Sequence, residues 1–418
     1  MTERDDSILS PIEDAGSRGS TWSRNASGEW LVAGQPLSRI VDAVGATPCY
    51  LYDRDRLSER VRELRAQLPQ GVDLHYAMKA NPMPALVCHM ARLVDGIDVA
   101  SRGELRVALD SGMPAARISF AGPGKSELEL RQAVAAGVLT HIESFREIPV
   151  LAQASERSGS AARVAVRVNL PFELRASGMK MSGGARQFGI DAEQVPDMLR
   201  RIDAAQLSFE GFHLFAGSQN LRAAAIVEAQ TRSYDLVTGW LDQCPSVPRT
   251  INLGGGFGIP YTLQDLPLDL APIMDNLAAL AARARSDVPG ARLALELGRY
   301  LVGEAGLYVS RVIDRKLSRG QVFLVVDGGM HHHLAASGNF GQVMRRNYPV
   351  AVNRLSPSRE SASVVGPLCT PLDLLADRAD LDVAEVGDLV VVFQSGAYGR
   401  SASPREFLGH PDALEALV

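Results

Sequence analysis

Short apolar runs that end in polar residues or glycine recur along the middle of the chain and alternate with stretches of helical periodicity. Eight runs predict strands at 74–79, 97–101, 118–122, 140–144, 164–169, 212–217, 251–256 and 293–298. The intervening segments, such as 104–111 and 126–136, have the spacing of amphipathic helices. Eight strands alternating with helices predict a (β/α)8 TIM barrel, an α/β fold whose chemistry collects at the carboxyl ends of the strands. A doubly wound sheet is the alternative, but so many units in about 230 residues suit the barrel better.

The pattern changes after residue 306. The runs 307–313, 321–326 and 388–393 are β-type and are separated by turns, without long helices between them. They predict an all-β domain, which a strand at 30–32 near the N-terminus would complete. The expected organisation is a disordered tail at 1–27, a barrel at 49–308, and a β-domain built from 28–48 and 309–418.

Composition narrows the class of protein. A chain of 418 residues is long enough for two domains. Its net charge of −5 lacks the positive excess that favours binding to nucleic acid. The four cysteines have neither CxxC nor metal-site spacing, which favours a reducing compartment. No stretch reaches the roughly 18 apolar residues of a membrane span, and the N-terminus has no apolar leader, so we expect a cytoplasmic protein.

Lys79 is one of four lysines, and it ends the apolar run before Asn81-Pro82. This spacing predicts a lysine at the mouth of the barrel, where a desolvated amine would be a usable nucleophile toward an aldehyde. The alternative is a strand-end lysine that only extends its charge into water. The other three, Lys125, Lys180 and Lys316, are interpreted as surface charges.

Two further strand ends carry candidate chemistry. Gly254, Gly255 and Gly256 follow a late strand, where backbone N–H groups could close around a phosphate, although a tight turn needs glycines as well. Glu296 closes the last barrel strand among apolar neighbours, so it requires a cation or a protonated heterocycle. Pairing with Arg299 is an equally good explanation at this level.

Cys369 lies in a turn-rich segment of the β-domain rather than in an apolar strand. Lone cysteines usually pack in cores, but a loop cysteine beside Thr370 is a candidate proton donor. The tract His331-His332-His333 has the composition of a metal site. Consecutive residues in regular structure cannot all face one ion, so we predict no metal there.

In combination the motifs YAMKAN, GIDVASRGEL, GPGK, HIES, HLFAGSQ, NLGGGFG, ELGRY, VDGGM, GPLCTPLD and SGAYG resemble the fold-type III pyridoxal-phosphate decarboxylases. That family contains the diaminopimelate, ornithine and arginine decarboxylases, and the likeness runs from about residue 30 to 411. The resemblance implies an alanine racemase-like barrel joined to a β-domain, bound pyridoxal 5'-phosphate, and a homodimer with shared active sites.

The resemblance also implies roles for single residues. Lys79 would form the Schiff base with the cofactor, and Cys369 would return a proton to Cα after carbon dioxide leaves. Glu296 would keep the pyridine nitrogen protonated, which favours decarboxylation over racemisation. Phe215 replaces the family's ring-stacking histidine. The remaining cofactor positions are Asp98, Arg167, Ser218, Gly254, Gly255, Gly256, Gly298 and Arg299, with Tyr398 reaching the phosphate from the partner chain.

The expected substrate follows from Thr370, which stands where diaminopimelate decarboxylases carry Glu and ornithine decarboxylases carry Asp to receive a distal ammonium. A substrate with a cationic far end would leave its charge unpaired. Thr370 and Asp373 are the predicted substrate residues.

The motifs GPLCTPLD, VDGGMHHH and SGAYGRSASPREFLGHP resemble the sub-group that decarboxylates amino acids tethered to acyl-carrier proteins in antibiotic biosynthesis. Arg345, Arg346, Arg400 and Arg405 could supply a basic rim for an acidic carrier, although such arginines are usually just solvated. The alternatives are decarboxylation of a free amino acid such as diaminopimelate, and a non-catalytic, cofactor-binding regulatory homologue. Retention of Lys79, Glu296 and Cys369 counts against the last.

Overall fold

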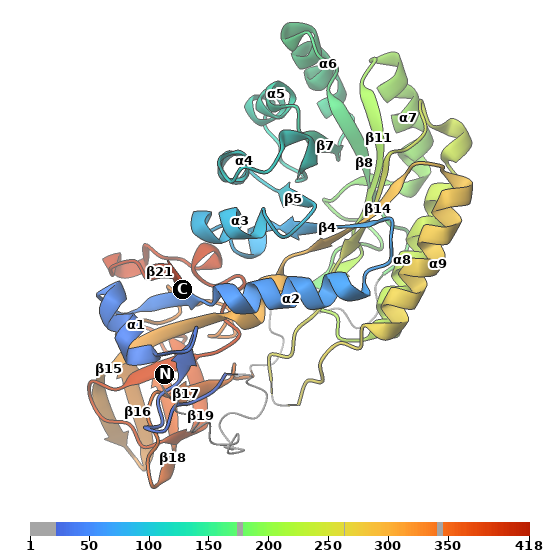
Figure 1. The fold of residues 1–418 in the computed structure, drawn as a ribbon. Coiled ribbons are helices and arrows are strands. Elements are labelled where there is room, and N and C mark those ends of the chain that lie inside the picture. Colours follow the sequence, from blue (N-terminus) through green and yellow to red (C-terminus); the bar gives the residue numbers. More distant parts are fainter. Residues whose placement is uncertain (1–21, 174–178, 263, 341–345) are drawn as a thin grey trace, which may run out of the picture. The chain divides into compact units, whose positions relative to one another are not determined.

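The computed structural model describes residues 22–173, 179–262, 264–340 and 346–418. The chain divides into two compact units (Figure 1), and each is described by itself. Unit 1 comprises Met1–Asp55, Pro260–Asp265 and Glu304–Val418, and unit 2 comprises Arg56–Ile259 and Leu266–Gly303.

Unit 2 is a closed barrel of eight parallel strands, as the sequence predicts. The strands are β4 Val72–Ala77, β5 Gly96–Val99, β6 Ile118–Phe120, β7 Leu139–Ile142, β8 Arg163–Asn169, β11 Ser208–Leu214, β13 Thr250–Gly255 and β14 Arg292–Leu297. They pair in the order β8-β11-β13-β14-β4-β5-β6-β7, and the pairing of β7 with β8 closes the ring. The short strand β10 Ile190–Asp191 also pairs with β8.

Helices connect the barrel strands and surround them (Figure 1). They are α2 Arg54–Gln67, α3 Pro84–Met90, α4 Arg102–Asp110, α5 Glu127–Ala136, α6 Glu147–Ser158, α7 Val195–Ala204, α8 Ala223–Thr238, α9 Ala271–Asp287 and α10 Arg299–Val302. Local sequence sets their ends. Ser126 and Glu129 form a reciprocal capping box at the start of α5, and Gly137 ends that helix in the left-handed conformation.

Lys79 lies just beyond a barrel strand rather than at its last position. β4 ends at Ala77, and Lys79 is the middle residue of a single 3-10 turn, η1 Met78–Ala80. The turn closes because the Asn81 N–H donates to the Met78 carbonyl at 3.0 Å, while the Tyr76 hydroxyl donates to the Asn81 carbonyl at 2.7 Å. The predicted strand is therefore confirmed, but its end is two residues earlier than expected.

Unit 1 contains the predicted β-domain. Its main sheet has the order β17-β20-β15-β16-β18-β19; β3 pairs with β15, and β21 pairs with β3. The strands are β3 Cys49–Tyr52, β15 Gly306–Ser318, β16 Gln321–Val326, β17 Val350–Val352, β18 Arg359–Val365, β19 Leu374–Asp382, β20 Leu389–Val392 and β21 Leu414–Leu417. The helix α1 Leu37–Val44 ends at Gly45, which has the left-handed conformation.

Two boundaries of the β-domain differ from the sequence expectation. Cys49–Tyr52 was assigned to the barrel, but β3 pairs with β15 and β21 inside unit 1. All four residues of this strand are buried, so its apolar run carries no sign of which sheet it joins. The predicted disordered tail is wrong for residues 22–27, because Trp22 packs in the core of unit 1. Residues 1–21 lie outside the described residues.

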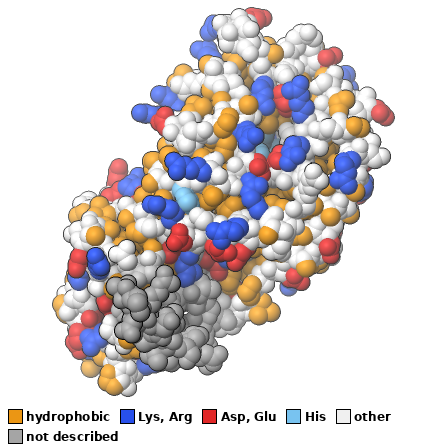
Figure 2. All heavy atoms as spheres, viewed as in Figure 1, with side chains coloured by type: hydrophobic (Ala, Val, Ile, Leu, Met, Phe, Trp, Pro, Cys, Tyr) orange, Lys and Arg blue, Asp and Glu red, His pale blue; other side chains and the backbone are white. Residues whose placement is uncertain are grey.

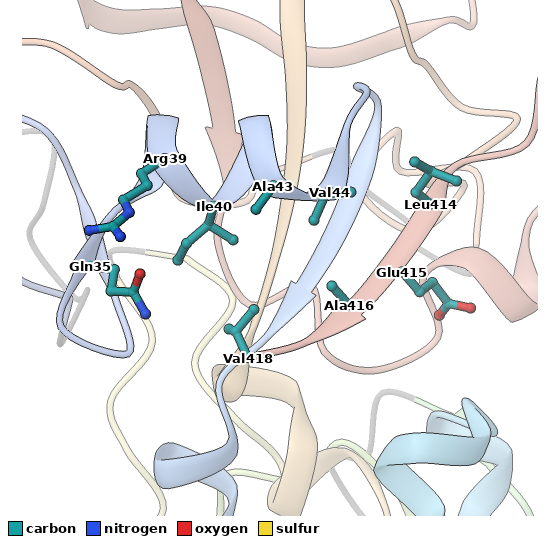
Figure 3. Close-up of a pocket in the computed structure, with 9 residues that line it drawn as sticks. All are labelled: Gln35, Arg39, Ile40, Ala43, Val44, Leu414, Glu415, Ala416 and Val418. Atoms are coloured by element: carbon teal, nitrogen blue, oxygen red, sulfur yellow. The ribbon is translucent and has the colours of Figure 1, made fainter.

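Unit 1 also has a groove of about 650 Å³ between α1 and β21 (Figure 3). It is lined by Gln35, Arg39, Ile40, Ala43, Val44, Leu414, Glu415, Ala416 and Val418. None of these residues belongs to the predicted active site.

All four cysteines are free thiols in the structure. Within the described ranges, none of the helices combines the length and the apolar character needed to cross a bilayer.

Candidate active site

Lys79 and Glu296 come together in unit 2, as expected. The Lys79 Nζ atom lies 3.5 Å from Oε1 of Glu296 and 5.2 Å from the centroid of the Phe215 ring. The Glu296 side chain is only 4% exposed, whereas that of Lys79 is 41% exposed. Lys79 is therefore not the fully desolvated amine that its sequence context predicted. Its charge faces a buried carboxylate and an aromatic ring.

Glu296 is held as a carboxylate. Burial by itself would raise its pKa, but the positive charge of Lys79 and a hydrogen bond from His213 outweigh burial and keep the pKa of Glu296 well below its ordinary value. His213 Nε2 lies 2.9 Å from Glu296 Oε2. This interaction spans from β11 to β14, on either side of β13. The site thus keeps an anion in the barrel interior at neutral pH.

Asp98 lies in the barrel interior beside two polar residues of neighbouring strands. Its Oδ1 atom accepts a hydrogen bond from Ser119 and lies 3.3 Å from His75 Nδ1. Burial lowers the pKa of His75, but the charge of Asp98 more than offsets this, so the pKa of His75 is raised. Register places the next link, because Glu296 of β14 pairs directly with His75 of β4. His75 therefore lies between the two acidic residues in the barrel, in contact with Asp98 and with its pKa also raised by the charge of Glu296.

Arg167 belongs to a buried charge network at the carboxyl ends of β6, β7 and β8. Its Nη1 lies 2.8 Å from Oε1 of Glu143, which also accepts the backbone N–H of Gly122 at 2.5 Å. The other Glu143 oxygen accepts the N–H of Gly189 at 3.1 Å. Glu143 thus ties three barrel-rim segments together. Burial raises its pKa, but Arg167 and other nearby charges overcome this and lower it.

Lys125 extends this network and corrects one sequence prediction. It was interpreted as a surface charge, yet its side chain is 1% exposed and its Nζ lies 3.1 Å from Glu147 Oε1. The same amine donates to the carbonyls of Gly122 at 2.7 Å and His141 at 2.9 Å. Of the other lysines, Lys316 is exposed as expected, and the side chain of Lys180 lies outside what the structure describes.

The triple-glycine turn comprises the last two residues of β13, Gly254 and Gly255, and the residue after it, with positive φ at Gly254 (70°) and Gly256 (85°). A Cβ at Gly254 would lie 2.6 Å from the Leu214 carbonyl oxygen, and one at Gly256 would overlap the Gly217 carbonyl. The Gly254 N–H donates to Asn252 Oδ1 at 2.8 Å, so that particular amide is already engaged. The turn therefore needs glycine for close backbone packing, whatever it binds.

Three other predicted positions adjoin this part of the barrel. Ser218 belongs to β12 Gly217–Ser218, which pairs with β9 Met179–Lys180. Gly298 precedes α10 and packs on the Lys79 turn, because a Cβ there would lie 2.8 Å from that of Ala80. Arg299 starts α10 directly after this contact. Their roles toward a phosphate stay predictions.

In unit 1, the loop that carries Cys369 is shaped by Asp373. One Asp373 oxygen accepts the Met330 N–H at 2.6 Å, and the other accepts the Leu368 N–H at 2.8 Å. Burial raises the pKa of Asp373. The geometry favours a loop-forming role for Asp373 over the predicted substrate contact. Cys369 is exposed and Thr370 is half-buried, so both stay candidates for the reaction.

Tyr398 also belongs to unit 1. It has positive φ (54°), and its ring stacks on Phe340 at 6.2 Å between centroids. The three histidines of the 331–333 tract are fully buried packing residues, and His333 Nε2 lies 2.9 Å from Ser395 Oγ. Among the described residues, no group of three or more His, Cys, Asp or Glu side chains could hold a metal ion.

Sequence reasoning missed His213, His141, Glu143 and Glu147 as members of the site. His213 was recoverable, because it is two residues before Phe215 and alternation along a strand places both on one face. His141, in β7, and Glu143, directly after that strand, are related in the same way. No sequence signal shows that Glu147, at the start of α6, reaches Lys125.

Comparison with known proteins identifies a family and relatives to which this chain is similar. The family described as pyridoxal-dependent decarboxylase, pyridoxal binding domain, matches residues 54–303. The L-glutamyl-[BtrI acyl-carrier protein] decarboxylase of Niallia circulans is 39% identical over 383 residues, covering 89% of this chain and 88% of that protein. The 2-[(L-alanin-3-ylcarbamoyl)methyl]-2-hydroxybutanedioate decarboxylase of Staphylococcus aureus is 30% identical, covering 90% and 96%.

A solved structure agrees in fold over nearly the whole chain. The diaminopimelate decarboxylase of M. jannaschii, in complex with L-lysine, superposes with a TM-score of 0.84 at 25% identity. The match covers 96% of this chain and 93% of that one.

Proposed function

The chain belongs to the pyridoxal-dependent decarboxylases, and from that premise we propose that its substrate is an acidic or neutral amino acid tethered to an acyl-carrier protein. The coarser activity, pyridoxal phosphate-dependent decarboxylation of an amino acid, comes with the family. The tether and the side chain are the proposal.

The donor set of unit 2 fits pyridoxal phosphate. A buried anion, Glu296, suits a protonated ring nitrogen, and an amine 3.5 Å from it, that of Lys79, suits an aldehyde. Phe215 offers a ring face for stacking, and the glycine turn leaves no room for side chains beside the backbone. When bound, the cofactor supplies an electron sink for the Cα–carboxylate bond.

The chain's own residues would then divide the work. Glu296 would keep a proton on the ring nitrogen because its own pKa is held well below its ordinary value. Lys79 would supply the amine that holds the cofactor. We propose that Cys369 returns the proton to Cα.

The loop at 366–373 supports an acidic or neutral substrate side chain. Asp373 is its only carboxylate, and both oxygens of that carboxylate accept backbone N–H groups. A distal ammonium reaching this loop would find no free anion on it, and an unpaired buried charge is costly. By their names, the two relatives compared above act on a glutamyl group held on a carrier protein and on a hydroxybutanedioate, and neither name contains a cationic far end.

The tether rests mainly on the relative with 39% identity, whose named substrate is bound to a carrier protein. The predicted basic rim adds little to it. Arg400 pairs with Asp412 at 2.5 Å and with Glu415 at 3.0 Å, and Arg405 pairs with Asp412 at 2.6 Å. Arg345 lies outside the described residues. Figure 2 shows basic and acidic side chains interleaved on the face in view.

A direct competition tests the substrate. Purified protein with pyridoxal phosphate is given equal amounts of glutamate and aspartate, each free or loaded on a carrier protein through its side-chain carboxyl, together with free diaminopimelate, and mass spectrometry follows loss of the α-carboxylate as carbon dioxide. We expect turnover of the loaded forms at least about tenfold above the free acids, since the tether adds binding energy that a free acid lacks. Preferential turnover of free diaminopimelate would contradict the proposal and favour the alternative that the M. jannaschii relative represents.

Thr370 gives a matched variant for the same assay. Thr370→Glu introduces a free carboxylate into the loop and should raise turnover of diaminopimelate, whereas the neutral Thr370→Gln should not. Equal effects of the two variants would mean that this position does not sense the distal charge.

We propose further that the protein acts as a homodimer whose active sites combine Lys79 of one subunit with Cys369 and Tyr398 of its partner. Mixing inactive Lys79→Ala and Cys369→Ala proteins after reversible dissociation tests this. Shared sites predict recovery of about a quarter of wild-type activity, because half of the dimers would be mixed and each would hold one intact site. No recovery from mixed dimers would show that each subunit uses its own pair.

A further inference from the structure

The barrel interior holds two histidines that have no assigned role and that adjoin the Glu296 carboxylate. His213 and His141 are 1% and 2% exposed. Their ring centroids are 4.3 Å apart, with an angle of 30° between the planes. His213 Nε2 lies 2.9 Å from Glu296 Oε2. The three side chains thus form a chain of contacts from β7 through β11 to β14.

We propose that His213 and His141 are positioning residues for Glu296, with His213 donating its Nε2–H to Oε2 and His141 fixing the plane of the His213 ring by stacking. The inference rests on the role proposed above for Glu296, and it concerns what holds that carboxylate in place.

The direction of the hydrogen bond follows from the partners. An ionised carboxylate only accepts, so the ring nitrogen facing it must carry the proton. In a neutral His213 the other nitrogen, Nδ1, is then an acceptor. Within the described part of the chain, that buried Nδ1 has no hydrogen-bond partner. If Nδ1 also carried a proton, its N–H would be a buried donor without an acceptor. An unprotonated Nδ1 avoids this, so the surroundings fit a His213 ring with its proton on Nε2.

His141 is suited to be a neutral stacking partner. Burial, and the proximity of His213, hold the pKa of His141 well below its ordinary value. Its backbone carbonyl accepts Lys125 Nζ at 2.9 Å, which ties the strand at this point to the buried charge network. A flat uncharged ring, fixed at its backbone, limits rotation of His213 about its side-chain bonds.

The consequence is a carboxylate with its two oxygens assigned. Oε2 is engaged by His213, and Oε1 lies on the side of Lys79, 3.5 Å from its amine. The other charged groups that act here are His75, which pairs in register with Glu296, and Arg167 and Lys125, which both act on His141. If His213 did not donate, rotation of the carboxylate would be opposed mainly by Lys79, whose side chain is flexible and partly exposed.

The test uses two matched pairs of variants. His213→Leu removes the donor at similar volume, and His213→Gln keeps an N–H near the Nε2 position. His141→Phe keeps a flat ring without titrating, and His141→Ala removes the ring. Circular dichroism and cofactor retention establish that each variant folds.

Two readouts distinguish positioning from a purely structural role. The first is the pH midpoint of the absorbance change of the bound cofactor without substrate, and the second is kcat and KM with substrate. For His213→Leu we expect the midpoint to move by about one unit and kcat to fall about tenfold to a hundredfold, the value of a buried charge-assisted hydrogen bond, with KM within about threefold. His213→Gln should recover most of the loss, and His141→Phe should resemble wild type while His141→Ala does not.

An unchanged midpoint and kcat in His213→Leu would overturn the inference, and so would equal damage in His141→Phe and His141→Ala. Glu296→Gln separates this failure from that of the proposed function. If Glu296→Gln shifts the midpoint and His213→Leu does not, only the positioning role is wrong. If neither shifts it, the role of Glu296 itself is wrong.

Discussion

The amine of Lys79 and the carboxylate of Glu296 lie 3.5 Å apart, although 216 positions separate them along the chain. Their strands β4 and β14 are neighbours in the closed barrel, and the 3-10 turn after β4 brings the amine back toward the end of β14. A half-exposed cation thus faces a buried anion, and the charge of Lys79 lowers the pKa of Glu296.

Lys79→Ala should abolish turnover and the near-visible absorbance of covalently held cofactor, because among the described residues no other lysine contacts Glu296. It should also cost about 1–2 kcal/mol of unfolding free energy, less than a fully buried pair because Lys79 is partly exposed. Lys79→Arg is the control, since a guanidinium restores the ion pair but not the nucleophile. Absorbance and chemical denaturation measure the two effects. Covalent cofactor in Lys79→Ala would exclude the assignment.

Cys369→Ala should slow the return of the proton to Cα or misdirect it, with little effect on stability because Cys369 is exposed. A decrease of about a hundredfold in kcat is the expected scale for loss of a general acid. Mass spectrometry in deuterated water measures the site of protonation, and Cys369→Ser provides a weaker acid of similar size. Normal turnover with a single amine product would exclude this role for Cys369.

The barrel was predictable from sequence because its strands are short apolar runs with regular spacing, and all eight are present. The residues at which those strands end were less predictable. Lys79 lies beyond β4 because the Asn81-Pro82 break is preceded by a 3-10 turn, and apolar residues such as Met78 suit a buried turn as well as a strand. Trp22 packs in the core although its neighbours are polar, so local composition gave no sign of it.

The candidate site was predictable where a residue type is rare, and not where the role depends on a distant partner. Lys79 stood out among four lysines, and Glu296 among apolar neighbours. Lys125 gave no such sign. Its burial depends on Glu147 and on the carbonyls of Gly122 and His141, which only the closed barrel brings together.

Lys125→Met should therefore destabilise the protein by about 3–5 kcal/mol, because it leaves the Glu147 carboxylate buried without its cation. The double variant Lys125→Met with Glu147→Leu should recover a large part of this, since no uncompensated charge remains. Urea denaturation of the single and double variants gives the coupling energy. If the destabilisations of the two single variants add up to that of the double variant within about 0.5 kcal/mol, the two side chains do not stabilise one another.

Acidification should destabilise the protein through the buried histidine tract of unit 1. Burial, with His332 and His410 nearby, lowers the pKa of His331 from 6.5 to about 4. The unfolded chain therefore takes up the proton first as the pH falls, so the stability associated with His331 is complete above pH 6.5 and is lost progressively down to about pH 4. The difference in pKa corresponds to about 3 kcal/mol for this residue.

His331→Phe isolates that contribution. The ring can still stack where His331 contacts His332, at 3.8 Å between centroids, but it cannot take up a proton in either state. Urea denaturation at pH 7.5, 5.5 and 4.5 should show the variant gaining on wild type as the pH falls. The variant should still lose some stability on acidification, because burial also lowers the pKa of His333, to about 3, and that of His332. Parallel pH dependences for the two proteins would show that His331 takes up its proton equally in the folded and unfolded states, and that its burial does not control acid stability.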